Sequence, residues 1–217
     1  MSKNFKPNGF MVDLEFADKS ESSAIMQIAI VPIDTVAMVY ETDKSKCLFL
    51  HVDPDDCVKH GMTIGIDTIK WWIKQDQKVL QNAFDLNSKE YKHPLPVALA
   101  KVTNFISQFF QKDDTSMQIF QRGDKDSAIL NYAYNQVFKY DAPWKFWDVR
   151  CIRILENVFQ QFKPDTSKNT HNALSDALNQ ADWLCQYMRH AVSLETGKPK
   201  SRKAVEPVAD VPQDDDL

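Results

Sequence analysis

The sequence is short of glycine and cysteine, and both shortages argue against common kinds of site. Only 5 of the 217 residues are glycine, and none lies in a GxGxxG or GxxxxGK[ST] arrangement. Dinucleotide-binding and P-loop folds use such glycines to cradle phosphates, so we expect no nucleotide cofactor bound in those ways. The 4 cysteines are too far apart for a zinc ribbon, a CxxC redox site or a disulfide-stapled secreted domain; they are Cys47, Cys57, Cys151 and Cys185.

Long apolar runs and an excess of positive charge are also missing. Residues 24–33 form one of the longest apolar runs, well below the roughly 20 residues of a membrane helix. Residues 1–9 are polar and contain no signal-peptide core. Lys and Arg number 26 against 30 Asp and Glu, a formal charge of −4, so no global positive field would hold nucleic acid or lipid. We expect a soluble, cytoplasmic globular protein without a membrane partner.

The first quarter of the chain predicts a strand-rich meander. Residues 10–16 form a strand in which Asp13 and Glu15 face the same side, because side chains alternate along an extended chain. Residues 24–33 and 46–52 are further strand candidates, and residues 35–40 are a candidate for another.

Helices and strands alternate in the rest of the chain. A helical stretch at 60–86 contains Trp71 and Trp72 in tandem, and a second helix follows Pro94 and Pro96. Strands at 117–121 and 145–149 alternate with helices at 126–139 and 150–161, which favours parallel strands joined by crossovers. The second helix has an apolar stripe at spacings of three and four, formed by Leu99, Val102, Phe105, Ile106, Phe109 and Phe110.

The last predicted helix follows His171 and ends near His190. Its inner face is marked by Leu174, Ala177, Leu178, Ala181, Leu184, Cys185 and Met188. Beyond residue 194 large apolar side chains almost disappear and the chain ends in an acidic run. We therefore predict one domain at residues 1–194 and a disordered acidic tail at 195–217.

Four acidic residues lie at informative places along these elements. Asp13 and Glu15 share a strand face, Asp126 follows the strand at 117–121, and Asp176 lies on the last helix. Singly, each has an ordinary interpretation, such as a helix N-cap for Asp126. If they converge, they repel one another unless divalent cations neutralise them. Oxygen ligands of this kind suit Mg²⁺ or Mn²⁺.

His171 lies five positions before Asp176, immediately ahead of the last helix. A neutral imidazole near the carboxylates could accept a proton from an attacking water, because its pKa lies near working pH. The alternative is an ordinary surface or capping histidine. The remaining histidines share no ligand-like spacing; they are His51, His60, His93 and His190.

With these residues, the chain resembles the DEDD superfamily of 3′-to-5′ exonucleases, in its His-containing subgroup, DEDDh. The matching motifs are Asp13-Leu14-Glu15, Asp126-Ser127-Ala128-Ile129-Leu130 and His171-Asn172-Ala173-Leu174-Ser175-Asp176. Thr68 to Trp72, Arg122-Gly123 and Lys145 to Arg150 further resemble the branch that includes exonuclease A of T-even bacteriophages and mycobacterial exoribonucleases. The resemblance implies an α/β, RNase H-like fold, a mixed five- or six-stranded sheet flanked by helices.

The resemblance also implies a reaction and a set of site residues. The chain would hydrolyse single-stranded RNA or DNA from its 3′ end and release nucleoside 5′-monophosphates. Two Mg²⁺ or Mn²⁺ ions would be held by Asp13, Glu15, Asp126 and Asp176, with His171 as general base. Substrate would contact Leu14, Phe16, Trp71, Trp72 and Arg122. A phage origin, and so a location in the host cytoplasm, and a homodimer are compatible with this branch.

Three alternatives stay open at this point. The spacing after Arg122-Gly123 is one residue short of the family pattern, so Asp124 rivals Asp126 as the second-motif ligand. We prefer Asp126, because Ile129 and Leu130 after it reproduce the family helix. An RNase H-like endonuclease is a second candidate function. A catalytically silent module that binds nucleic acid or a protein partner through Arg122, Arg150 and Arg153 is a third.

Overall fold

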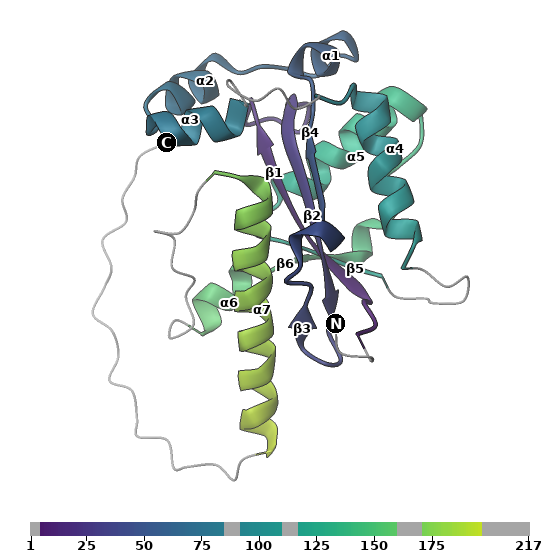
Figure 1. Cartoon of the computed structure of the whole chain (residues 1–217), viewed down its shortest axis with the longest axis vertical. Coiled ribbons are helices and arrows are strands. Elements are labelled where there is room, and N and C mark those ends of the chain that lie inside the picture. Colours follow the sequence, from purple (N-terminus) through teal and green to yellow (C-terminus); the bar gives the residue numbers. More distant parts are fainter. Residues whose placement is uncertain (1–4, 85–91, 110–116, 160–170, 197–217) are drawn as a thin grey trace.

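The computed structural model describes residues 5–84, 92–109, 117–159 and 171–196. Within these ranges, a mixed 6-stranded sheet has the order β3-β2-β1-β5-β6, with β4 also paired to β2 (Figure 1). The strands are β1 (Gly9–Phe16), β2 (Ile25–Asp34), β3 (Val39–Tyr40), β4 (Leu48–His51), β5 (Gln118–Gln121) and β6 (Val149–Cys151). β1 to β4 pair antiparallel, whereas β5 is parallel to both β1 and β6. The predicted parallel crossover strands are confirmed, but the opening strands do not form a simple meander, because β3 and β4 both pair with β2.

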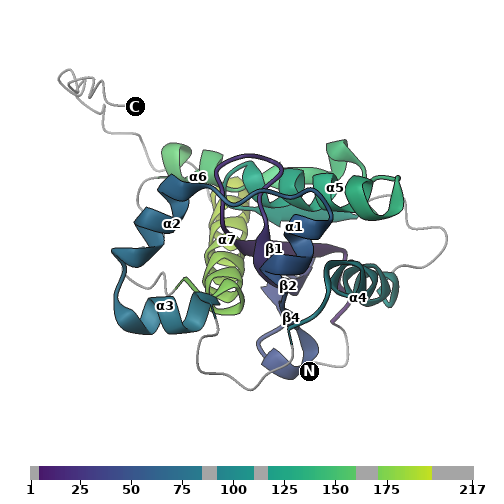
Figure 2. The ribbon, with the colours of Figure 1, turned by 90° about the horizontal axis from the view of Figure 1, so that it is seen from above.

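Helices cover both faces of this sheet. They are α1 (Pro54–Lys59), α2 (Ile66–Ile73), α3 (Gln77–Phe84), α4 (Leu95–Ser107), α5 (Lys125–Phe138), α6 (Arg153–Val158) and α7 (Ala173–Thr196). Seen from above, α4 and α5 lie on one side of the central strands and α7 on the other, with α2 and α3 beyond α7 (Figure 2). Within the described ranges, no helix is both long and apolar enough to cross a membrane.

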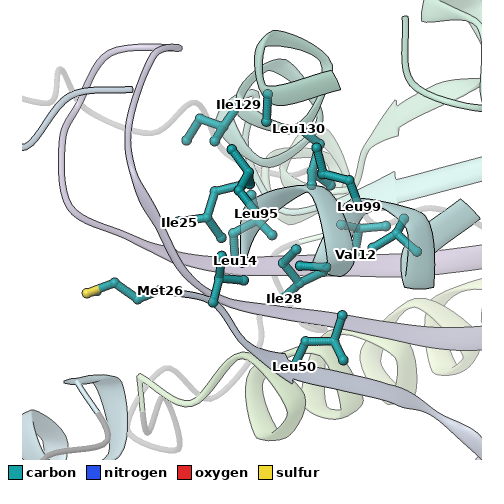
Figure 3. Packing of buried hydrophobic residues seen from close by; sticks show 14 of the residues in the cluster. Val12, Leu14, Ile25, Met26, Ile28, Leu50, Leu95, Leu99, Ile129 and Leu130 are labelled. Carbon is teal, nitrogen blue, oxygen red and sulfur yellow. The ribbon is translucent and has the colours of Figure 1, made fainter. Parts of the chain in front are cut away.

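The alternation of β1 side chains divides the core between the two faces. Val12 and Leu14 join the larger cluster, together with Leu99 of α4 and Ile129 of α5 (Figure 3). Met11 points the other way, into the cluster beneath α7. All ten residues of β2 are buried, as expected for a central strand covered on both faces. Truncating a core residue such as Leu99 to Ala should destabilise the fold by about 2–5 kcal/mol.

Several predicted boundaries were wrong because local hydrogen bonds compete with the regular elements. Residues 145–149 were expected to form a strand, but Phe146–Asp148 is a 3-10 turn and β6 begins only at Val149. The Lys145 amide donates to the Asp148 carboxylate at 3.0 Å, and the Asp148 amide donates back to the Lys145 carbonyl at 2.9 Å. This reciprocal pair closes the turn. The helix predicted at 150–161 is correspondingly shortened to Arg153–Val158 within the described residues.

The stretch predicted as one helix at 60–86 was also wrong. Gly61, with φ of 84°, follows the end of a separate α1, and α2 and α3 are distinct helices. The sequence did carry a start signal for α1, since Asp53 caps its first turn and Pro54 occupies its first position. At the other end, α7 runs to Thr196, beyond His190 and past the predicted start of the tail. Residues 110, 160–170 and 197–217 lie outside the described residues.

Candidate active site

Asp13 and Glu15 occupy the end of the β1 face that α7 covers. Met11 begins this row of alternating side chains, and the next two positions of the same face are Asp13 and Glu15. The pairing of β1 with β5 ends at Met11, although β1 continues to Phe16. The two carboxylates therefore lie at the carboxyl end of β1, past the last residue paired with β5, and Glu15 is buried.

Asp126 reaches the same place from the first turn of α5. Its Oδ1 accepts a hydrogen bond from the Leu14 amide at 3.0 Å, so α5 supplies the acceptor that β5 no longer provides. Gln121, the last residue of β5, fixes the start of α5, because its side-chain oxygen accepts from the Ser127 amide at 2.7 Å. Asp126 is buried, whereas Asp124 is an exposed N-cap residue whose side chain makes no cap hydrogen bond.

The first turns of α7 bring Asp176 and His171 to this site. The side-chain oxygen of Asn172 caps the helix by accepting from the Ser175 amide at 3.1 Å. A buried glutamine of β2, Gln27, accepts from the Ala173 amide at 3.0 Å and so ties the helix start to the sheet. Asp176 is buried in the first turn, and His171 has a left-handed φ of 48°. A non-glycine residue in that region is strained and needs surrounding structure to hold it.

The histidine ring lies against the tandem tryptophans of α2. Its centroid is 5.1 Å from the Trp71 ring and 5.6 Å from the Trp72 ring, both edge to face. Trp72 is 2% exposed and donates its indole N–H to the Phe16 carbonyl at 3.1 Å, which anchors α2 over the end of β1. Trp71 is 44% exposed. Trp72 therefore anchors α2, while the Trp71 ring has exposed surface that a ligand could contact.

Burial, together with neighbouring negative charges, raises the pKa of Asp13, Glu15 and Asp126. Burial, followed by the charges of Asp126, Glu15 and Asp176, raises the pKa of Asp13 well above its usual value. Burial and then the charges of Asp176 and Asp126 raise the pKa of Glu15 in the same way. Burial raises the pKa of Asp126 to about 7, against the opposing effect of the Leu14 hydrogen bond. Like charges crowded in a poorly solvated place destabilise the metal-free protein.

The donor set fits a divalent cation. Glu15, His171 and Asp176 each offer one ligand atom, and these three atoms lie within 4.8 Å of one another. Hard ions such as Mg²⁺ and Mn²⁺ prefer carboxylate oxygens and relieve their repulsion. Arg122, Lys125 and Arg153 line the same cavity, and the charge of Arg153 opposes the rise in the pKa of Asp126.

Two adjoining cavities meet at these residues. The first, of about 280 Å³, is lined by Asp13, Glu15, Asp126, His171 and Asp176 together. The second, of about 580 Å³, is lined by Trp71 and by three lysines, Lys19, Lys70 and Lys74. Glu15, Phe16 and His171 line both cavities. A group bound at the carboxylates can therefore extend into a space that has aromatic and cationic walls.

The other residues expected to contact substrate have different surroundings. The Leu14 side chain is buried in the core, so only its backbone amide faces the site. Arg122 is held by Glu156 in a two-pronged ion pair, with Nε–Oε1 at 2.6 Å and Nη2–Oε2 at 3.1 Å. Glu156 is buried, so this guanidinium has a structural partner.

Two glutamines at the site were not predicted from the sequence. The Gln180 amide donates to Asp13 Oδ1 at 2.7 Å, and Gln27 lies opposite Glu15 in the β1–β2 register. Gln180 is four residues after Asp176 and so falls on the same helix face. Gln27 is the one polar residue in residues 24–31, an otherwise apolar run. Both signals were present in the sequence.

Comparison with known proteins gives one family match and several structural neighbours. A family model described as the 3′-5′ exoribonuclease Rv2179c-like domain matches residues 8–188. No curated protein gives a significant match. The nuclease domain of 3′hExo, a DEDDh family member bound to rAMP, is 14% identical, with 87% of this chain and 95% of that chain covered and a TM-score of 0.53.

Two further solved structures have the same fold. A 3′-exonuclease described for 3′-end specific recognition of histone mRNA stem-loop is 14% identical, with 86% and 84% of the two chains covered and a TM-score of 0.55. Cell-death related nuclease 4 is 12% identical, with 84% of this chain and 64% of that chain covered and a TM-score of 0.55. At such identities the likeness concerns the fold, and it confirms the predicted RNase H-like sheet flanked by helices.

Proposed function

The chain belongs to the Rv2179c-like 3′-5′ exoribonuclease family, and from that premise we propose how its own residues carry out the hydrolysis. It is a metal-dependent 3′ exonuclease that acts on nucleic acid. In this proposal Asp13, Glu15, Asp126 and Asp176 are the metal ligands, and His171 is the general base. The products are nucleoside 5′-monophosphates.

The convergence of the four carboxylates on one cavity is the observation that supports this proposal. β1, α5 and α7 each contribute to it, and the pKa values of Asp13 and Glu15 are raised partly by the neighbouring charges. A protein without cations would be more stable if these positions were neutral. Two bound Mg²⁺ or Mn²⁺ ions would supply Lewis acidity to the attacking water and to the leaving 3′-oxygen.

Two observations support His171 as the group that moves the proton in this reaction. Its ring shares both cavities with Glu15, and its contacts with Trp71 and Trp72 fix its orientation. The neutral imidazole accepts the proton of the water that attacks the terminal phosphodiester. The bond between phosphorus and the 3′-oxygen then breaks, and that oxygen gains a proton from solvent. Such a base contributes about 10²- to 10⁴-fold to the rate.

The 580 Å³ cavity beside His171 is the proposed place of the 3′-terminal nucleotide. The exposed Trp71 ring and Phe16 offer apolar surface to its base and sugar, since stacking on an aromatic ring stabilises binding by about 1–3 kcal/mol per base. Lys19, Lys70 and Lys74 lie around the same cavity. The substrate class is single-stranded RNA or DNA, and degradation rates on matched RNA and DNA oligonucleotides will decide between them.

A 5′-labelled oligonucleotide tests the proposal. With Mg²⁺ or Mn²⁺ we expect a ladder of products shortened from the 3′ end, and Asp13→Asn or Asp176→Asn should abolish it. Asp182→Asn is the matched control, because Asp182 lies on α7 outside the two cavities. Internal cuts would indicate an endonuclease, and binding without cleavage would indicate a silent module. Full turnover by Asp176→Asn would overturn the ligand assignment.

A further inference from the structure

A third cavity, of about 950 Å³, begins where the carboxylate cavity ends. One wall is the exposed side of α5, with Ser127, Ala128 and Asn131, and the other wall is the segment of residues 141–149. Asp124, at the start of α5, lines both this groove and the carboxylate cavity. The carboxylates therefore lie between the 580 Å³ cavity beside α2 and this larger groove beside α5.

Two large aromatic side chains stand exposed in the groove. Phe146 is 83% exposed and Trp147 is 55% exposed, whereas the neighbouring Trp144 is buried. The Phe146 and Trp147 rings meet edge to face at 4.8 Å. Scattered exposed apolar residues are ordinary, but adjacent exposed rings beside a groove mark an interaction surface. The fold does not need these rings for its core, since Trp144 fills the core position of this segment.

Cationic groups accompany the rings. The Lys145 ammonium lies 5.1 Å from the centroid of the Trp147 ring. The Arg150 guanidinium donates to the backbone carbonyls of Trp147 and Val149, and Arg153 lines the carboxylate cavity. Exposed rings interleaved with Lys and Arg are typical of surfaces that bind single-stranded nucleic acid.

We propose that this groove binds the bases on the 5′ side of the bond to be cut, stacked on Phe146 and Trp147. The inference rests on the proposed function and extends it to the part of the strand that stays bound after each cleavage. Asp124 and Asp141 also line the groove, so phosphates are disfavoured inside it. Base amino groups can donate to those carboxylates, while the phosphates lie on the side of Lys145, which also lines the groove, and of Arg150.

The dependence of KM on substrate length tests this groove. In the full chain, Phe146→Ala with Trp147→Ala should raise KM for a long single-stranded oligonucleotide at least about fivefold, the loss of one stacked base. The value of kcat, and KM for a nucleoside 5′-phosphate ester that has no base on the 5′ side of the bond, should change by less than twofold. The single variant Trp147→Phe keeps both aromatic rings and should retain most of the affinity for the long oligonucleotide. Val36→Ala, at another exposed apolar side chain outside the groove, is the control.

A second measurement locates the bases directly. An oligonucleotide with a single 5-iodouracil placed 5′ of the terminal nucleotide should photo-crosslink to Trp147 in an Asp176→Asn protein, which binds without cutting. Crosslinks confined to the 580 Å³ cavity, or unchanged length dependence in the double variant, would overturn the groove. So would a change from dimer to monomer in the double variant, because the rings would then face a second copy. If the native protein shortens no oligonucleotide, the proposed function itself fails.

Discussion

Asp126→Asn should stabilise the metal-free protein even though it abolishes activity. The substitution removes one negative charge from the carboxylate cavity. It keeps a side-chain oxygen that can accept the Leu14 amide hydrogen bond, which is 3.0 Å long in the native protein. The change therefore tests the charge of Asp126 separately from its role in joining α5 to β1.

The magnitude follows from the raised pKa of this group. Burial raises the pKa of Asp126 from 3.8 to about 7. Each pKa unit corresponds to about 1.4 kcal/mol, so ionised Asp126 destabilises the fold by at most about 4 kcal/mol above neutral pH. The amide also needs desolvation when buried, so we expect a net gain of about 1–3 kcal/mol for the Asn variant.

The direction of the pKa shift determines how the stability of the native protein changes with pH. The folded pKa is higher than the unfolded pKa, so the folded state holds its proton more tightly. The stabilising contribution of this proton is complete below about pH 4 and is lost as pH rises through 7. The advantage of Asp126→Asn should accordingly be large at pH 8 and disappear near pH 4. Addition of Mn²⁺ at pH 8 should stabilise the native protein more than the variant.

Urea unfolding in the presence of a chelator measures these differences. Asp124→Asn is the matched control, because Asp124 lies two residues earlier and is exposed; we expect its free energy of unfolding to change by less than about 0.5 kcal/mol. If Asp126→Asn is no more stable than the native protein at pH 8, burial of the ionised Asp126 carboxylate does not destabilise the fold as its raised pKa indicates. If Asp124→Asn gains as much stability as Asp126→Asn, the charge of Asp124 beside Asp126 accounts for the gain rather than the burial of Asp126.

Three further predictions concern the residues around the carboxylates. His171→Ala should lower kcat by about 10²- to 10⁴-fold with little change in the Mn²⁺ dissociation constant measured by calorimetry; an equally large loss of Mn²⁺ affinity would make His171 a ligand instead. Glu156→Gln should reduce the free energy of unfolding by about 2 kcal/mol, because it leaves Arg122 without its charged partner, and Arg122→Met in the same protein should recover part of that loss in urea unfolding. Trp72→Phe should cost about 1–3 kcal/mol in the same assay, because the Phe16 carbonyl loses its donor, and unchanged stability would show that α2 is not anchored through this bond.

The sequence was sufficient for the elements whose side chains repeat with a clear period. Alternation predicted that Asp13 and Glu15 share a face of β1, and the structure places both toward α7. The apolar residues of α7 repeat at helical spacing, and Ala177, Ala181 and Leu184 do lie in the cluster that covers the sheet. Periodicity works here because each of these faces contacts a single continuous layer.

The sequence was insufficient where a few polar groups decide the local path of the chain. Nothing in the pattern of residues 145–149 separates a strand from the 3-10 turn, since the outcome depends on the two hydrogen bonds between Lys145 and Asp148. The same turn presents Phe146 and Trp147 to solvent, whereas a strand would have pointed alternate residues inward. The proposed groove is therefore a consequence of the element that the sequence predicted wrongly.

The candidate site differs from the periodic elements because contacts between distant parts of the chain hold it. The Leu14–Asp126, Ala173–Gln27 and Asp13–Gln180 hydrogen bonds join residues 112, 146 and 167 positions apart. Each bond has one end on β1 or β2. The side chains of these two strands away from the site belong largely to the two apolar core clusters. The site is thus a polar continuation of the core, and its carboxylates are positioned by the packing of α5 and α7. A cavity cut into the cluster beneath α7, for instance by Leu184→Ala, should therefore weaken Mn²⁺ binding as well as stability, even though Leu184 lines neither cavity at the site.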